Sequence, residues 1–168
     1  MRYVLTIIIM TLTTMVNAQK IMPVDNFELD RYLGLWYEIA RYTLWFERDM
    51  ENVTAEYIKE KDYLRVINKG VKGGKEKTAK GKATYDKNST IGKLRVSFFW
   101  PFKSDYLVIK LDDNYQWAIV SDYKKSSLWI LSRSYNMEKE LYNSLIEWLK
   151  LMGFDETKIE KTIHKYKS

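Results

Sequence analysis

The stretch Arg31-Tyr-Leu-Gly-Leu-Trp-Tyr-Glu-Ile-Ala-Arg41 determines how the rest of this 168-residue chain is interpreted. Gly34 divides it: residues before the glycine mix polar and apolar side chains, and large, strand-favouring side chains follow from Trp36 onward. This pattern predicts a turn or short helix that leads directly into a strand. Tyr32, Trp36 and Tyr37 also place three aromatic rings beside a residue that has no side chain. Such a concentration of apolar area suits the plugged end of a β-structure.

Strand-like runs follow at short, regular intervals. Turn-forming residues separate them, as in Lys61-Asp62, Gly73-Gly74 and Asp112-Asp113-Asn114. After a first strand from Leu35 to about Phe46, the predicted strands are Val53–Lys59, Tyr63–Asn68, Thr78–Tyr85, Lys93–Phe99, Asp105–Leu111, Tyr115–Asp122 and Leu128–Ser134. Eight antiparallel strands joined mostly as hairpins close into an up-and-down barrel, whose interior holds side chains and one small ligand.

A helix is predicted after the strands. Between Met137 and Met152, apolar residues recur at three- and four-residue intervals, and Gly153 ends the pattern. Such a helix buries its apolar stripe against the outside of a barrel. The tail from Asp155 to Tyr166 is predicted to form a short second helix and a final extended piece. The predicted fold class is therefore all-β with a C-terminal helix: an eight-stranded antiparallel up-and-down β-barrel with an α-helix packed outside.

The N-terminus has the features of a signal peptide. Met1-Arg2 is a short basic start, Tyr3 to Met15 is apolar with threonines, and Val16-Asn17-Ala18 supplies compact residues before a cleavage point. We expect residues 1–18 to be a signal peptide and residues 19–168 to form one domain of 150 residues, since 168 minus 18 is 150. An uncleaved membrane anchor is the alternative, which the shortness of the apolar run disfavours.

Three short blocks of sequence, in order along the chain, resemble the motifs of one known family. Gly34-Leu35-Trp36-Tyr37 matches a Gly-x-Trp motif, Val120-Ser121-Asp122-Tyr123 resembles a Thr-Asp-Tyr-like turn, and Leu128 to Arg133 resembles a block that ends in an arginine. These are the three motifs of the lipocalins, and the chain resembles in particular the bacterial lipocalins related to apolipoprotein D. The resemblance spans roughly Val24 to Phe154. It implies a barrel that binds a small hydrophobic molecule, with a role in maintaining the bacterial envelope.

The resemblance also implies a structural cluster at the closed end of the barrel. Its members are Gly34, Trp36, Asp122, Tyr123 and Arg133. The arginine on the last strand is expected to lie across the tryptophan of the first strand in a cation–π and packing contact. These residues are therefore expected to stabilise the fold, not to contact the ligand.

The ligand site is predicted from aromatic residues at alternating positions. Aromatic residues make up 15% of the chain, and an eight-stranded barrel cannot fill every inward position without strain. The residues expected to line the cavity are Ala40, Tyr42, Tyr57, Val96, Phe98, Tyr106, Val108, Trp117 and Trp129. For any single ring, packing in the core is the alternative role. We expect a fatty acid or lysophospholipid as ligand, because each buried CH2 group contributes roughly 0.8 kcal/mol.

Glu38 is the most informative polar residue in this region. It shares one alternating set of positions with Trp36, Ala40 and Tyr42, so an inward orientation would place a carboxylate low in an apolar cup. We favour a structural ion pair with an arginine, either Arg133 or Arg41, over direct recognition of the ligand.

Catalysis is disfavoured by the residues the chain lacks. There is no cysteine, and the single histidine, His164, lies in the tail without metal-ligand spacing around it. Nucleotide-binding motifs are also missing. We therefore expect no catalytic residues, no metal and no cofactor. A lipid-modifying enzyme on the same barrel, or a partner-binding barrel filled by its own aromatic residues, are the alternative functions.

The net charge and the lack of cysteine bear on the partners of the protein and on its cellular location. The net charge is +6, and much of the excess lies in the lysine-rich segment Lys69–Lys82. This segment has no arginine or aromatic residue, which argues against nucleic acid; a solvated loop with an edge strand is favoured over attraction to anionic lipid headgroups at a membrane surface. Gln19 stands where a lipoprotein would need cysteine. We therefore expect an exported protein, periplasmic or secreted, without a lipid anchor.

Overall fold

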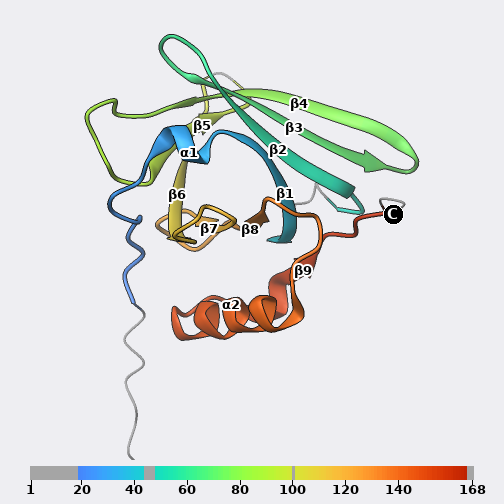
Figure 1. Cartoon of the computed structure of the whole chain (residues 1–168). Helices are drawn as coiled ribbons and strands as arrows, with labels where there is room; N and C mark the ends of the chain where they lie inside the picture. Colours follow the sequence, from blue (N-terminus) through green and yellow to red (C-terminus); the bar gives the residue numbers. More distant parts are fainter. Residues whose placement is uncertain (1–18, 44–47, 100, 166–168) are drawn as a thin grey trace, which may run out of the picture.

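The computed structural model describes residues 19–43, 48–99 and 101–165. Its strands form one antiparallel sheet in the order β2-β3-β4-β5-β6-β7-β8-β1-β9. The sheet closes on itself because β1 pairs with β2 as well as with β8. The result is an eight-stranded barrel with β9 added beside β1 and one helix outside (Figure 1). The predicted fold class is confirmed.

The elements follow the order expected from the sequence. Their bounds are α1 Leu29–Tyr32, β1 Gly34–Tyr42, β2 Glu51–Lys59, β3 Leu64–Lys72, β4 Lys75–Thr84, β5 Lys93–Ser97, β6 Ser104–Leu111, β7 Trp117–Ser121, β8 Leu128–Ser132, α2 Lys139–Leu151, η1 Glu156–Lys158 and β9 Ile159–Lys161. The predicted signal peptide, residues 1–18, and the predicted end of the first strand at Phe46 lie outside the described residues.

The hairpin of β3 and β4 is longer than predicted. Pairing continues from Leu64–Ala83 to Lys72–Lys75, across a turn whose two residues, Gly73 and Gly74, have φ angles of +57° and +73°. Two successive positive φ angles form the tight turn that matches the twist of paired strands, and glycine adopts them without steric cost. The lysine-rich segment expected to be partly a loop is therefore mostly strand.

Apolar side chains form two clusters, one inside the barrel and one between the wall and helix α2. The interior cluster comprises Phe27, Tyr32, Trp36, Tyr57, Leu64, Val66, Ala83, Leu94, Tyr106, Val108, Tyr115, Ala118, Val120 and Leu131. The helix-side cluster comprises Ile21, Ile39, Ala40, Tyr42, Leu107, Ile109, Ile119, Leu128, Ile130, Leu145, Leu149 and Phe154. Two separate cores therefore share the strands β1, β6, β7 and β8.

Helix α2 supplies the cover for the helix-side cluster. It lies outside the barrel, below the strands in Figure 1, and buries Leu145 and Leu149 while Leu151 is 78% exposed. Within the described residues, no helix combines the length and apolarity needed to cross a membrane.

We predict that Leu149→Ala lowers the free energy of unfolding by about 2–5 kcal/mol, because Leu149 is fully buried and its loss leaves a cavity between α2 and the barrel. Urea denaturation followed by circular dichroism measures the change. Leu151→Ala on the same helix is the matched control and should shift stability by less than about 0.5 kcal/mol. Equal effects of the two substitutions would contradict the packing of α2 described above.

Candidate functional site

Arg133 lies at the centre of the closed end of the barrel. Its guanidinium carbon is 3.8 Å from the centre of the Trp36 ring, which is fully buried. The cation–π contact expected between these residues is confirmed. Gly34 has a φ of +90°, and a side chain there would start 3.6 Å from Nη1 of Arg133. Glycine at this position therefore lets the chain turn from α1 into β1 beneath the arginine.

The same guanidinium joins the last barrel strand to the first. Nη1 donates to the carbonyl oxygen of Leu35 at 2.7 Å, and Nη2 donates to those of Arg31 and Leu33 at 2.8 and 2.9 Å. Arg31 lies in the last turn of α1, Leu33 lies between the two elements, and Leu35 lies in β1. Arg133 thus satisfies three backbone acceptors at the point where a helix ends and a strand begins.

Two residues predicted for the closed end lie elsewhere, and this part of the prediction is wrong. Asp122 and Tyr123 form the turn between β7 and β8, at the ends of these strands opposite to Arg133. The Asp122 carboxylate accepts hydrogen bonds from the hydroxyls of Ser126 and Ser127, both at 2.6 Å. It therefore organises its own turn, as an aspartate commonly does in a tight loop.

The turn that does reach the closed end precedes β7 and carries Tyr115. The Tyr115 hydroxyl accepts a hydrogen bond from the backbone N–H of Glu28 at 2.8 Å, and Arg31 stacks 4.2 Å from the centre of its ring. The tyrosine backbone oxygen also accepts a bond from Nε of Arg133 at 3.3 Å. The sequence alone does not single out Tyr115, because the Asp-Tyr pair of the motif lies in the following turn, and Asp112-Asp113-Asn114 indicates only that a turn precedes Tyr115.

Six of the residues predicted to line a cavity do face the barrel interior. Tyr57, Tyr106 and Val108 belong to the interior cluster, and Val96, Phe98 and Trp129 pack against it. The extent to which side chains are buried differs along the barrel interior. The rings of Tyr32 and Trp36, beside α1, are fully buried, whereas Val96, Phe98 and Trp129 are only partly buried. The interior is therefore densely filled near the closed end and less filled on the other side.

Three residues predicted to face the ligand lie on the other face of the wall, which corrects their assignment. Ala40 and Tyr42 belong to the helix-side cluster, and Trp117 packs against it. The cause in β1 is a bulge: Glu38 pairs with Leu131, but Ala40 pairs with Ile130, so the alternation reverses at Ile39. In β7 both faces are apolar, and the smaller Ala118 and Val120 face the interior instead of the tryptophan.

Three tyrosine hydroxyls meet inside the barrel. Tyr106 Oη is 2.6 Å from Tyr32 Oη and 2.7 Å from Tyr57 Oη, and all three side chains are buried. Burial raises the pKa of each hydroxyl above the ordinary value for tyrosine. The hydroxyls therefore stay protonated and satisfy one another in an otherwise apolar layer.

A second polar group lies in the wall next to this layer. Glu38 and Arg41 form a buried ion pair, with 4% of each residue exposed. This confirms the expected structural pairing of Glu38 and identifies Arg41 as the partner. The Thr162 hydroxyl donates to Oε1 of Glu38 at 2.6 Å and accepts from Nη1 of Arg41 at 3.1 Å. The group is neutral as a whole, because the two charges compensate each other.

Thr162 reaches this pair because the C-terminal segment closes a seam in the wall. β1 pairs with β2 only between Gly34 and Tyr37, and beyond that point it pairs with β9. After β9, the backbone N–H of Thr162 donates to Ile39 at 3.0 Å, and the carbonyl of Ile163 accepts from Asn52 on β2 at 2.9 Å. The segment thus bridges the two strands where they diverge.

Hollows on the outer surface do not resemble an apolar ligand site. One of about 510 Å³ is lined by residues near α1 that include Lys59, Lys61, Asp86 and Lys87. Another of about 350 Å³ lies between α2 and the C-terminal segment, with Lys139 and Lys161 in its lining. Within the described ranges, no group of three or more histidine, aspartate or glutamate side chains could hold a metal ion.

The geometry described so far defines a class: an antiparallel barrel plugged at one end, with an interior lined mainly by apolar and aromatic side chains. A family model described as "Lipocalin-like domain" matches residues 27–164. The chain belongs to the lipocalin family. Members of this family bind small hydrophobic molecules, so the barrel interior is the candidate site.

Individual relatives agree with this assignment. The outer membrane lipoprotein Blc of Vibrio cholerae is 42% identical over 145 residues, which cover 84% of this chain and 85% of the relative. Apolipoprotein D of Bos taurus is 34% identical over 119 residues, covering 66% and 62%. The structure of insecticyanin from the tobacco hornworm Manduca sexta superimposes with a TM-score of 0.71 at 22% identity, covering 89% and 86%. The resemblance to the bacterial, apolipoprotein D-like lipocalins is confirmed.

The names of these relatives contradict the cellular location expected from the sequence. The relatives from Vibrio cholerae and Escherichia coli are both named outer membrane lipoproteins, which conflicts with the expectation of a protein without a lipid anchor. That expectation depended on the lack of cysteine in the chain, with Gln19 at the predicted cleavage point. The names of the relatives overturn it.

We predict that Arg133→Lys lowers the free energy of unfolding by about 2–3 kcal/mol, because an ammonium group cannot bond all three carbonyls and stack on Trp36 at once. Thermal and urea denaturation measure the loss. Arg65→Lys is the control, since Arg65 makes a single exposed ion pair with Glu60 and its replacement should cost less than about 0.5 kcal/mol. A fully stable Arg133→Lys protein would contradict the role assigned to the guanidinium.

We predict that Tyr106→Phe lowers the free energy of unfolding at neutral pH by about 1–3 kcal/mol, because the buried hydroxyls of Tyr32 and Tyr57 lose their shared partner. In the unmodified protein, stability should be insensitive to these groups below about pH 10 and fall above it. The unfolded tyrosines ionise there, while the folded ones, with raised pKa, still hold their protons. Denaturation at several alkaline pH values measures both effects. Tyr123→Phe, at an exposed turn, should change neither.

Proposed function

We propose that the protein binds a fatty acid or lysophospholipid in the barrel interior and carries or stores it at the bacterial envelope, without catalysing a reaction. The observation that carries the proposal is the gradient of burial along the interior. The rings of Tyr32 and Trp36, beside α1, are fully buried. The inward-facing Val96, Phe98 and Trp129 are only partly buried. Apolar surface that faces inward and stays uncovered is suited to an acyl chain.

Burial of an acyl chain in the barrel contributes enough free energy for tight binding. Each CH2 group removed from water contributes roughly 0.8 kcal/mol, so a long chain yields sub-micromolar binding even after its loss of freedom is subtracted. The tyrosine layer around Tyr106 limits how deep the chain can extend, because Tyr32, Tyr57 and Tyr106 are packed and bonded to one another.

The headgroup would remain toward the open side of the barrel. The polar group in the wall is neutral, since Arg41 is already paired with Glu38, and therefore offers no free charge for a carboxylate or phosphate. An ionised headgroup buried there would lose its hydration without an equivalent partner. A ligand with an apolar tail and a polar head fits this division better than one that is polar throughout.

Two other functions are less well supported. A lipid-modifying enzyme would need a reactive group facing the ligand, but the chain has no cysteine, and Nε2 of its one histidine, His164, lies 2.8 Å from the backbone oxygen of Glu38 in the C-terminal segment. A barrel filled by its own aromatic residues is disfavoured because the inward-facing Trp129 is only partly buried. Each of these alternatives predicts a different result when the protein is titrated with lipid.

We predict that isothermal titration calorimetry of the protein with oleic acid and with a lysophosphatidylcholine gives saturable one-to-one binding to at least one of them. Trp129→Ala should weaken it about 10- to 100-fold, because an inward-facing indole is lost from the wall.

Trp117→Ala is the matched control, since Trp117 lies on the neighbouring strand but faces the helix side. It should leave affinity within about two-fold and lower only stability. Absence of saturable binding to either lipid would refute a lipid carrier and favour the filled barrel. Chemical change of the lipid, seen by mass spectrometry after incubation, would favour the enzyme.

A further inference from the structure

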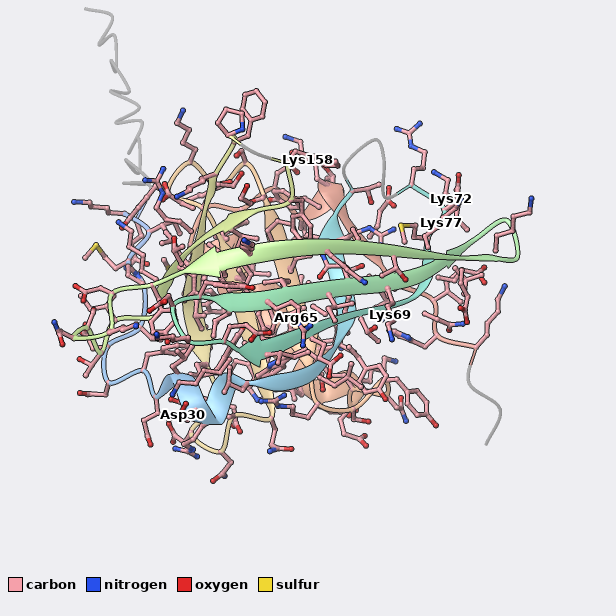
Figure 2. The ribbon with its side chains drawn as sticks, turned by 90° about the horizontal axis from the view of Figure 1, so that it is seen from above. Asp30, Arg65, Lys69, Lys72, Lys77 and Lys158 are labelled. Carbon is pink, nitrogen blue, oxygen red and sulfur yellow. The ribbon has the colours of Figure 1, made fainter. Side chains whose placement is uncertain are left out.

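We propose that the β3–β4 hairpin is a docking surface for a membrane that contains anionic phospholipids. The hairpin carries Lys69, Lys72, Lys75, Lys77 and Lys80 on and beside its two-glycine turn. It extends past the other strands in Figure 1, and Figure 2 shows Lys69, Lys72 and Lys77 along it. This inference adds a partner to the proposed lipid carrier but is tested separately from it.

The far half of β4 has no packing role in the barrel. Lys75 to Lys80 are all exposed, on both faces of the strand. β4 pairs with β5 only from Lys82 to Thr84, so Lys75 to Lys80 have β3 as their single neighbour. The predicted edge strand therefore exists locally, although β4 as a whole lies inside the sheet. A structural role in the core does not account for these lysines.

The charges of the hairpin are not used within the protein. Among the residues that the structure describes, no carboxylate lies within ion-pair distance of the five lysines, in contrast to Lys59, Lys87, Lys150 and Lys165. Glu76 is the only acidic residue between Lys69 and Lys82. The hairpin thus presents a nearly uniform positive surface, and an anionic lipid layer has the complementary charge.

The lysine-rich β3–β4 hairpin lies at the open end of the barrel, where a lipid would enter. In an antiparallel barrel the β3–β4 and β5–β6 turns lie at the same end, opposite to α1 and Arg133. The β5–β6 connection carries two exposed rings, Phe99 at 78% and Phe102 at 76% exposure. Lysines that attract headgroups and aromatic rings that enter the interface are the two contributions peripheral membrane binding requires.

The test is co-sedimentation with vesicles of phosphatidylcholine alone or mixed with an equal amount of phosphatidylglycerol. One variant combines Lys72→Gln, Lys75→Gln and Lys77→Gln. The matched control combines Lys61→Gln, Lys139→Gln and Lys158→Gln, which removes the same charge from other exposed positions. Because each lysine near an anionic surface strengthens partitioning about five-fold, the hairpin variant should bind mixed vesicles about 100-fold more weakly, and the control should bind like the unmodified protein.

Salt and neutral lipid provide two further arms. Binding should weaken steeply as salt rises and be slight on pure phosphatidylcholine, because the attraction is electrostatic. Equal binding to both kinds of vesicle would overturn the proposal in favour of capture of lipid by the barrel. Equal losses in the two triple variants would overturn it in favour of non-specific charge attraction. Calorimetry with soluble lysophospholipid on the hairpin variant separates the two proposals: unchanged affinity there, with lost vesicle binding, supports the docking surface by itself.

Discussion

The structure depends on one guanidinium group at the closed end. Arg133 follows the last barrel strand, yet it bonds the backbone that leads into the first strand and covers the ring of Trp36. A barrel made from a single sheet has to join strands that are about a hundred residues apart, and each such closure costs chain entropy. A planar group with several donors meets this need better than an apolar contact, because it fixes direction as well as distance.

Strand β1 shows how one short segment serves two cores. Before Ile39 its even-numbered residues, such as Trp36, face the interior; after the bulge Ala40 and Tyr42 face helix α2. The reversal lets the strand plug the barrel at one end and support the helix at the other. It also turns Arg41 toward Glu38, so the one buried charge pair of the described wall is a product of the same irregularity.

Sequence reasoning established the barrel, its strand order and the outer helix, because alternation and turn residues are local signals. It also found the Arg133–Trp36 contact and the pairing of Glu38 with an arginine. It failed where the outcome depended on distant partners. A bulge cannot be located from alternation alone, so Ala40 and Tyr42 were assigned to the wrong face. Trp117 was expected to face inward as an aromatic residue at an alternating position, but both faces of its strand are apolar, so alternation does not select a face. Asp122-Tyr123 was chosen by motif, whereas spatial position selects the turn that contains Tyr115.

The seam closed by residues 159–165 bears on the order in which the protein folds. Those residues are made after all eight barrel strands, but they bridge β1 and β2, which are among the first strands made. A nascent chain can therefore form its central hairpins early but cannot complete the wall beside Glu38 and Arg41 until residues 159–165 have been made. Until then the two buried charges lack Thr162, which disfavours a prematurely closed barrel and keeps the incomplete chain open.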